Sequence, residues 1–400
     1  FSRGIPTKTW NSLLNNENHP LRDKTIQDHY SPGSVFKIVT AIAALQEGVI
    51  DENTKFHCPG VIKIGNRLYH CHSRHGEINV VRAITQSCDV FFYRVAQKLR
   101  SVDDIAKWAT ILGLGKKTGI NLAGEVPGLI PTEEWKKRKL NQEWNAGETA
   151  TVAIGQSFVL TTTLQLSNLY AALANGGTLF RPFIVKKIES SEGEVLKEYH
   201  PEILSQVHLN PKTVELVKQG LWGVMNSPIG TGYSQRIPGV DFAGKTGTVQ
   251  VIRLAADKIY TKCETMKFHD RHNAIFVGFA PIKDPSIAVA IVGEHACHGA
   301  TGAAPIARAI IKKYLEKYFP DVYGEKAIAA RTKGLGKNFI QIPPKAALIE
   351  DEGFADGGDE NDTLPASGES LPVPLVPPTL PGDTQGDSAD DENSSEADRH

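Results

Sequence analysis

Two polar residues, Ser34 and Lys37, stand at the start of a strongly apolar stretch of the chain. Acyl transfer by a serine hydroxyl needs a base that is close enough to take its proton. On a helix, the residue three positions after the serine lies on the same face and can supply that base. The spacing therefore predicts a nucleophile with its general base. Taken alone it is also ordinary, because serine is a common first residue of helices.

Two further motifs follow this pair along the chain. Ser87-Cys88-Asp89 interrupts a helical pattern, where a polar turn between helices would also explain it. Lys245-Thr246-Gly247-Thr248 lies in a run with strand periodicity, and glycine inside a strand often marks close approach of a ligand to the backbone. The order Ser-x-x-Lys, Ser-x-Asp, Lys-Thr-Gly matches the active-site motifs of penicillin-binding proteins and serine β-lactamases.

The sequence resembles the class B penicillin-binding proteins, and among them the elongation type, from residue 1 to about residue 320. Aspartate at position 89, where asparagine is commoner, is more similar to the elongation type than to the division type. The resemblance implies a penicillin-binding-protein or serine β-lactamase-like fold and covalent inhibition by β-lactams. The stretches that carry it outside the three motifs are Tyr30-Ser31-Pro32-Gly33, Gly155-Gln156, Thr163-Leu164-Gln165-Leu166, Ala174-Asn175-Gly176-Gly177 and Glu294-His295-Ala296-Cys297-His298-Gly299.

The resemblance implies roles for the residues of the first two motifs. Ser34 attacks the carbonyl carbon of a D-Ala-D-Ala peptide bond, and Lys37 acts as its base once burial favours the neutral amine. Ser87 relays the proton to the leaving D-Ala. Asp89 either fixes Lys37 electrostatically or accepts a hydrogen bond from the substrate, and the sequence leaves both roles open.

The third motif is expected to bind the substrate. Lys245 supplies positive charge, the hydroxyls of Thr246 and Thr248 bind the terminal carboxylate, and Gly247 lets the ligand approach the strand. By resemblance, the backbone N–H groups of Ser34 and Thr248 form the oxyanion hole. In other enzymes, loss of one such donor lowers the rate by about a hundredfold to a thousandfold.

Three of the five cysteines and one histidine follow the pattern Cys58-x12-Cys71-x3-His75-x12-Cys88. Three thiolates with one imidazole are a recognised set of structural zinc ligands. A disulfide and plain burial remain alternatives, because oxidising compartments favour disulfides and free cysteine is a good core residue. Elongation-type relatives have Cys, Asp and His metal ligands in this stretch, so the resemblance implies a structural zinc and no cofactor for catalysis. The competing ligands are His57, His70 and His72.

The remaining cysteines, Cys263 and Cys297, are expected to be single thiols that are buried or incidental. The basic run from Lys136 to Lys139 is expected on a solvated surface.

Helices and strands must position these motifs, and periodicity predicts both. Apolar residues at helical spacing predict helices over 34–48, 162–175 and 303–318, and over 78–98 a pair of helices that meet at a polar turn. Strand periodicity predicts strands over 241–252, 273–280 and 286–293. Helices first and strands later indicate an α+β domain with an antiparallel sheet. The resemblance implies that helices and an all-helical subdomain flank this sheet.

Length and composition are those of one large domain with a tail. The 400 residues are 40% hydrophobic, which is enough for a large core. We expect an N-terminally truncated transpeptidase domain over 1–320, a linker over 321–341 and a disordered, acidic, proline-rich tail over 342–400. The formal net charge of −1 is against a nucleic-acid partner. No run of about 18 apolar residues predicts a membrane span.

The function implied by the resemblance is peptidoglycan D,D-transpeptidation during cell elongation, with a D-Ala-D-Ala donor and an amine acceptor. The enzyme is expected at the periplasmic face of the inner membrane, anchored by an N-terminal segment absent from this chain, beside a membrane glycosyltransferase. One alternative is a D,D-carboxypeptidase or β-lactamase, which needs a deacylating residue that no evident motif supplies. Another is a non-catalytic β-lactam sensor, which the presence of both Lys37 and Lys245 disfavours.

Overall fold

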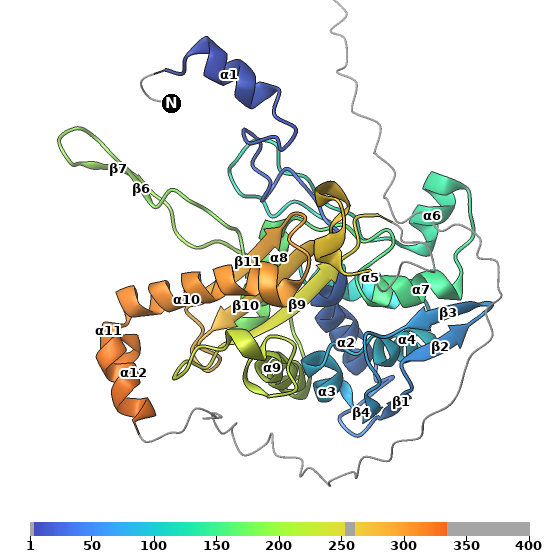
Figure 1. Cartoon of the computed structure of the whole chain (residues 1–400). Coiled ribbons are helices and arrows are strands. Elements are labelled where there is room, and N and C mark those ends of the chain that lie inside the picture. Colours follow the sequence, from blue (N-terminus) through green and yellow to red (C-terminus); the bar gives the residue numbers. More distant parts are fainter. Residues whose placement is uncertain (1–3, 253–260, 334–400) are drawn as a thin grey trace, which may run out of the picture.

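The structure is a computed structural model, and it describes residues 4–252 and 261–333. Its centre is a three-stranded antiparallel sheet in the order β11-β10-β9 (Figure 1). Each of the three strands lies within a segment for which the sequence predicts a strand, so this prediction is confirmed. They are β9 (Ala243–Val249), β10 (Asn273–Ala280) and β11 (Ile287–Gly293).

The middle strand, β10, is buried along nearly its whole length. Two helices, α8 (Thr163–Ala174) and α10 (Ala304–Tyr318), both contact β10 and β11. A strand that is covered on both faces carries a continuous run of apolar residues instead of alternating apolar and polar residues. The sequence of β10 has such a continuous run. Its register places Val277 opposite Lys245 and Ala274 opposite Thr248, which fixes where the third motif lies along the sheet.

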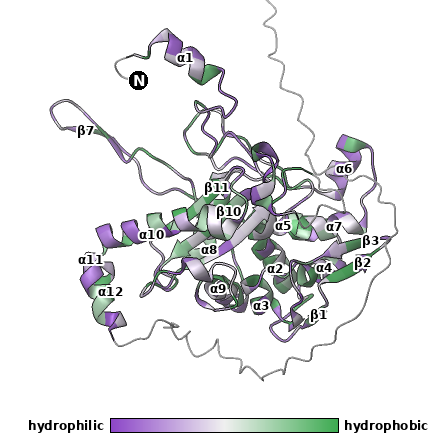
Figure 2. Ribbon diagram, in the orientation of Figure 1, coloured by the Kyte–Doolittle hydropathy of each residue, from purple (hydrophilic) through white to green (hydrophobic). Residues whose placement is uncertain are grey.

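The helices that precede the sheet pack around α2 (Lys37–Gln46), whose residues 37–44 are all buried. A helix that is enclosed on every side belongs to a core, and the apolar residues of α2 fit that place. Figure 2 shows hydrophobic residues on α2 and the central strands, whereas α6 at the rim is hydrophilic. The larger helices of this region are α3 (Val80–Thr85), α4 (Asp89–Lys98), α5 (Val102–Ile111), α7 (Ala146–Ala153) and α9 (Pro211–Asn226).

Smaller elements surround these two regions, and their strands form the pairs β1-β4, β2-β3, β5-β8 and β6-β7. The strands are β1 (Phe56–Cys58), β2 (Val61–Ile64), β3 (Arg67–His70), β4 (Gly76–Ile78), β5 (Thr178–Phe180), β6 (Lys187–Glu189), β7 (Val195–Glu198) and β8 (Ile203–Gln206). The helices are α1 (Thr7–Leu14), α6 (Glu133–Leu140), α11 (Pro320–Tyr323) and α12 (Glu325–Thr332).

The first part of the segment expected to be a linker contains α11 and α12. Tyr323 and Ile328 from these helices are partly buried against the core of the domain. The rest of that segment and the predicted tail lie outside the described residues. Within the two described ranges, no helix combines the length and apolarity that a membrane span requires.

Candidate active site

Ser34 lies in a tight turn directly before α2. Residues Gly33–Phe36 form a 3₁₀ helix, and Lys37 is the first residue of α2. In a 3₁₀ helix, side chains three residues apart lie one above the other, so Ser34 and Lys37 face the same side. Ser34 is half-buried, whereas Lys37 has no exposed surface. The predicted helix over 34–48 is therefore present as this turn followed by α2.

Two glycines shape the turn that carries Ser34. Gly33 has a φ of +55°, and a Cβ atom there would lie 2.7 Å from the Val249 side chain of β9. The Gly33 N–H donates to the carbonyl oxygen of Gly155 at 2.8 Å. A Cβ atom on Gly155 would lie 2.3 Å from the Gly33 carbonyl oxygen. The backbone before the serine is thus held between β9 and the segment that follows α7, where only glycine fits without displacement.

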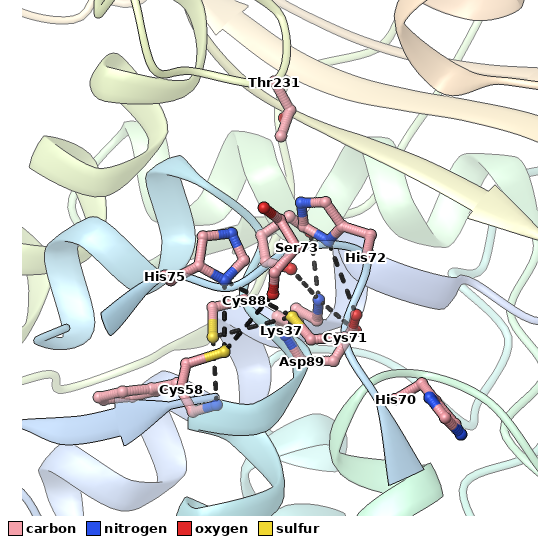
Figure 3. A network of polar contacts seen from close by, with 12 residues as sticks. Lys37, Cys58, His70, Cys71, His72, Ser73, His75, Cys88, Asp89 and Thr231 are labelled. Atoms are coloured by element: carbon pink, nitrogen blue, oxygen red, sulfur yellow. Dashed lines mark hydrogen bonds and ion pairs between the residues drawn. The ribbon is translucent and has the colours of Figure 1, made fainter. Parts of the chain in front are cut away.

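The Lys37 ammonium is the centre of a buried polar network (Figure 3). Its Nζ donates to the Ser87 carbonyl oxygen at 2.8 Å and to Ser87 Oγ at 3.1 Å. It also forms a 2.7 Å ion pair with Asp89. Burial raises the pKa of Asp89, but the charge of Lys37 and the hydrogen bonds from His72 and Lys37 together outweigh burial, and the net pKa of this carboxyl lies below its ordinary value. Of the two roles that the sequence left open for Asp89, contact with Lys37 is the one present in this structure.

Ser87 reaches Lys37 through the sharp junction of α3 and α4. Its φ is +55°, which is uncommon for a residue with a side chain and costs on the order of 1 kcal/mol or more. The two helices are capped on either side of it: Asn79 accepts from the Arg82 N–H at the start of α3, and Cys88 Sγ accepts from the Phe91 N–H at the start of α4. The pair of helices predicted over 78–98 is therefore confirmed, with the second motif at their junction.

Lys245 enters the same site from β9. It has no exposed surface, and burial, followed by the charge of Lys37, holds its pKa well below the ordinary value, although Asp89 offsets part of this effect. Its Nζ donates to the Thr246 carbonyl oxygen at 3.1 Å. A Cβ atom on Gly247 would lie 3.3 Å from Val35 in the Ser34 turn, so β9 and this turn are closely packed.

Thr246 contacts Thr231, which the sequence did not single out, and Thr248 contacts Gly299, the last residue of one stretch that carries the resemblance. The hydroxyls of Thr246 and Thr231 share a hydrogen bond of 2.6 Å, and the Gly299 N–H donates to Thr248 Oγ1 at 3.3 Å. The run Gly230-Thr231-Gly232 could have drawn attention to Thr231, because glycines on both sides of a polar residue often indicate a tight turn. Gly299 is packed so closely that a Cβ atom would lie 2.5 Å from the Gly247 carbonyl oxygen.

The cysteine and histidine residues predicted as a metal quartet lie together next to this network. The ligand atoms of Cys58, Cys71, His75 and Cys88 all lie within 4.8 Å of one another. His75 Nδ1 is 3.5 Å from Cys58 Sγ and 3.6 Å from Cys71 Sγ, and the sulfurs of Cys71 and Cys88 are 4.0 Å apart. The three cysteines are free thiols. A hydrogen bond from Cys88 lowers the pKa of the Cys71 thiol, while burial opposes this shift.

These separations can be compared with those around a tetrahedral zinc ion. With Zn–S distances of about 2.3 Å and Zn–N distances of about 2.0–2.1 Å, ligand atoms lie roughly 3.6–3.8 Å apart. The three distances given above are close to this spacing, and the donor types fit zinc. Among the competing histidines, His57 is exposed beside Glu77, and His70 is exposed at the end of β3. His72 instead lies 3.8 Å from Asp89.

Cys263 and Cys297 form a disulfide, so the expectation of two single thiols is wrong. The bond joins a segment that leads into β10 to the turn that follows β11. Periodicity could not indicate this pairing, because the two residues are 34 positions apart and meet only when the strands are paired. The turn after β11 also carries Gly299, so the disulfide supports one edge of the site.

Comparison with known proteins agrees with this arrangement. Residues 6–312 match the family model described as the penicillin binding protein transpeptidase domain. The peptidoglycan D,D-transpeptidase MrdA of Haemophilus influenzae is 33% identical over 351 residues, which are 86% of this chain and 53% of that protein. MrdA of Escherichia coli K12 is 32% identical over 322 residues, which are 79% of this chain and 49% of that protein. The chain thus spans about half the length of the curated relatives that it matches.

Solved structures share the fold. PBP2 of Pseudomonas aeruginosa, in complex with WCK 5153, has a TM-score of 0.67 at 30% identity and covers 78% of this chain and 64% of its own. PBP2 of Helicobacter pylori, in complex with MreC, has a TM-score of 0.66 at 28% identity, with coverages of 79% and 55%. The α+β fold expected from the resemblance is therefore confirmed. Because the family match extends over residues 6–312 of the 400, the chain belongs to the penicillin-binding protein transpeptidase family.

Proposed function

We propose that this chain is the catalytic part of a peptidoglycan D,D-transpeptidase of the elongation type. The observation that carries the proposal is the convergence of all three motifs on one buried lysine. Lys37 lies under the Ser34 turn, contacts Ser87 and Asp89, and is close enough to Lys245 to depress the pKa of that residue. The names of the MrdA relatives support the same activity.

The proposed reaction has two steps. Ser34 Oγ forms an ester with the penultimate D-Ala carbonyl carbon, and Lys37 takes the hydroxyl proton as the free amine, which requires that the ammonium first pass a proton to the paired carboxylate of Asp89. The C–N bond to the terminal D-Ala breaks, and Ser87, at 3.1 Å from Lys37 Nζ, passes the proton to the departing amine. The amine of a second stem peptide then attacks the ester, and its proton returns through the same groups to restore the Ser34 hydroxyl.

In this reaction the β9 motif binds the donor. Lys245 is buried, and among the described residues no carboxylate forms an ion pair with it. The terminal carboxylate of the donor would supply the missing counter-charge, together with hydrogen bonds from Thr246 and Thr248. Thr231 and Gly299 hold those two hydroxyls in place through the contacts described above.

Mass spectrometry of the intact protein after penicillin treatment tests this assignment. We expect one adduct per chain, mapped to the peptide that contains Ser34, and no adduct on Ser34→Ala. An adduct on the Ala variant would remove Ser34 as nucleophile. Turnover of a D-Ala-D-Ala donor with an added amine then separates the alternatives: a crosslinked product supports transpeptidation, and hydrolysis alone indicates a carboxypeptidase. A stable adduct without turnover of any donor indicates a sensor.

We further propose that Cys58, Cys71, His75 and Cys88 bind a structural zinc ion. The ion would balance the negative charge of the thiolates, and it would join the ends of β1 and β4 to the start of α4. No step of the reaction passes through it. Its effect on catalysis would come from Cys88, which lies between Ser87 and Asp89 and anchors both.

We also propose a location and partners, from the disulfide and from the solved structures of the relatives. A disulfide is typical of proteins that fold in oxidising compartments, which supports the periplasm. PBP2 of Helicobacter pylori was solved with MreC, and another relative at 30% identity was solved in a peptidoglycan synthase complex that coordinates polymerisation and crosslinking. We propose that this chain likewise works beside a membrane glycosyltransferase, with peptidoglycan stem peptides as substrates and β-lactams as inhibitors.

A further inference from the structure

The net charge of −1 conceals a strong separation of charge along the chain. Residues 334–400 contain fifteen Asp and Glu against three Lys and Arg, whereas residues 1–333 contain 41 Lys and Arg against 30 Asp and Glu. Within the acidic part, the segment 350–362 carries seven carboxylates, no Lys or Arg, and one aromatic residue, Phe354. We call residues 350–362 the acidic segment. Such asymmetry indicates that the two parts attract one another.

The positive charge of the folded part is concentrated in residues 55–98, which contain seven Lys and Arg against two Asp and Glu. Seven cations there are exposed, and none of them forms an ion pair with a described residue. The ion pairs within this region involve other side chains: Lys37 with Asp89, His57 with Glu77 and His72 with Asp89. Seven cations without partners therefore face solvent on one part of the fold. They form what we call the basic surface: Lys55, Lys63, Arg67, Arg74, Arg82, Arg94 and Lys98.

A pocket of about 510 Å³ lies within the basic surface, between β1 and α4. Lys55, Arg94 and Lys98 line it together with Phe56 and Glu77. The carboxylate of Glu77, which lies 3.2 Å from His57, can match at most one of the three cations. The Lys98 ammonium lies 5.9 Å from the centre of the Phe56 ring, which places a positive charge beside an apolar wall. The pocket thus suits an anionic peptide that also carries an aromatic side chain.

We propose that the acidic segment of this chain docks on the basic surface, with Phe354 at the pocket between β1 and α4. Sixteen residues, and so seventeen Cα–Cα steps, separate Lys333, the last described residue, from Glu350. At about 3.4 Å per residue they can extend to about 58 Å. A folded domain of this size is roughly 50 Å across, so the linker can extend over a distance comparable to the width of the domain. Because the segment is tethered, its effective concentration at the surface is on the order of millimolar, which compensates for weak individual charge pairs.

This docking connects the acidic segment to the supports of the catalytic site. The strand β1 ends at Cys58, and α4 begins at Asp89. An occupant of the pocket touches both elements at once without entering the site of Ser34. It also covers the cations that other anions would otherwise bind.

Carbodiimide crosslinking of the full chain tests the proposal, because this reagent joins lysine amines directly to neighbouring carboxylates. Protein with natural isotopes is mixed with an equal amount of protein labelled with ¹⁵N, and crosslinked peptides are mapped by mass spectrometry. We expect crosslinks from Lys55 and Lys98 to the acidic segment within single molecules. They should fall at least about fivefold between 0.1 M and 1 M salt, because the Debye length shrinks from about 10 Å to about 3 Å.

Two matched charge reversals test whether the acidic segment binds the basic surface specifically or is attracted to any exposed cation. Arg94→Glu reverses the third cation of the pocket while both reporter lysines remain, and it should lower their crosslinking at least about threefold. Arg138→Glu makes the same change on the exposed side of α6 and should leave it unchanged. The proposal is overturned if Lys186 and Lys197 on the β6-β7 hairpin react with the acidic segment as often as Lys55 and Lys98. Crosslinks that join mainly light and heavy copies, or the absence of crosslinks, overturn it as well.

Discussion

Lys37 and Lys245 are both completely buried, yet their surroundings differ in one respect. Lys37 has a carboxylate partner at 2.7 Å, and Lys245 donates only to a backbone carbonyl of its own strand. A buried ammonium without a counter-charge is costly, and this cost lowers its pKa. In the free protein the Lys37 ammonium is therefore paired, whereas Lys245 lacks a counter-charge until the carboxylate of a donor supplies one.

Replacement of Lys37 tests its role as the base. Lys37→Ala should slow acylation by a fluorescent penicillin at least about a hundredfold, because general-base assistance acts in the transition state. The affinity for the non-covalent complex should change much less. Stopped-flow kinetics at several penicillin concentrations separates the two quantities. Lys98→Ala, which removes a lysine from the exposed end of α4, is the control, and equal rates for both variants would remove Lys37 from the mechanism.

The burial of Lys245 predicts a dependence of stability on pH. Its pKa in the folded protein lies well below its ordinary value of 10.5. Between these two values the unfolded chain binds a proton that the folded protein does not. The free energy of unfolding should therefore rise with pH in this window, by up to about 1.4 kcal/mol per pH unit, and this contribution is lost as pH falls.

Urea unfolding at a series of alkaline pH values measures this effect. The difference between the wild type and Lys245→Met should grow in favour of the wild type as pH rises, because methionine has no proton to release. Parallel stability profiles for the two proteins would contradict the assignment.

At the scale of elements, the junction of α3 and α4 serves both the catalytic network and the cysteine cluster. Cys88 caps α4 through the Phe91 N–H, its sulfur lies 4.0 Å from that of Cys71, and its neighbours Ser87 and Asp89 contact Lys37. Any displacement of this short junction therefore moves two groups of the site together.

The proposed zinc ion makes a prediction at this scale. The purified protein should contain about one equivalent of zinc, and Cys71→Ser should lower both the zinc content and the free energy of unfolding. Acylation should slow by on the order of a hundredfold, because a small misplacement of catalytic groups has effects of that size. Metal analysis with a thiol count in denaturant gives the answer. An active, metal-free protein with two linked cysteines from the cluster would contradict it.

The disulfide makes a separate prediction for the turn after β11. The bond closes a loop of 34 positions, and its loss should lower the free energy of unfolding by about 3–4 kcal/mol. Urea unfolding of the double variant Cys263→Ser/Cys297→Ser measures this loss. Reductant should destabilise the wild type and leave the double variant unchanged. If reductant has the same effect on both proteins, another pair of cysteines is responsible.

At the scale of the whole molecule, the fold and the meeting of the three motifs could be predicted because each rests on local patterns. The motif order, the helical spacing after Ser34 and the apolar run of β10 are all visible in short windows. Thr231 and the partner of Cys263 could not be predicted, since both depend on which loops the folded sheet brings together. Lys136 illustrates the same limit: it lies in a basic run expected to be solvated, yet it is buried and pairs with Glu148 at 2.6 Å.

The prediction at this scale concerns where the folded domain ends along the chain. Tyr323 and Ile328 pack against the core, so α11 and α12 should contribute to stability although the sequence suggested a linker there. Tyr323→Ala/Ile328→Ala in the full chain should lower the free energy of unfolding by about 2 kcal/mol, from lost burial of two half-buried side chains. Lys326→Ala, on the exposed side of α12, is the control for helix propensity. Equal stabilities would show that these helices are loosely attached.

The five cysteines of this chain occur in two oxidation states, and this affects how the protein folds in the cell. Cys263 and Cys297 must be oxidised, while Cys58, Cys71 and Cys88 remain thiols within reach of one another. In the oxidising compartment proposed above, an unfolded chain would expose all five to the same oxidant, and sulfurs that approach one another before folding is complete can be joined wrongly. Bound zinc would shield three of them during that interval. A cell short of zinc would then accumulate wrongly crosslinked chains for degradation, instead of a metal-free enzyme that regains function when zinc returns.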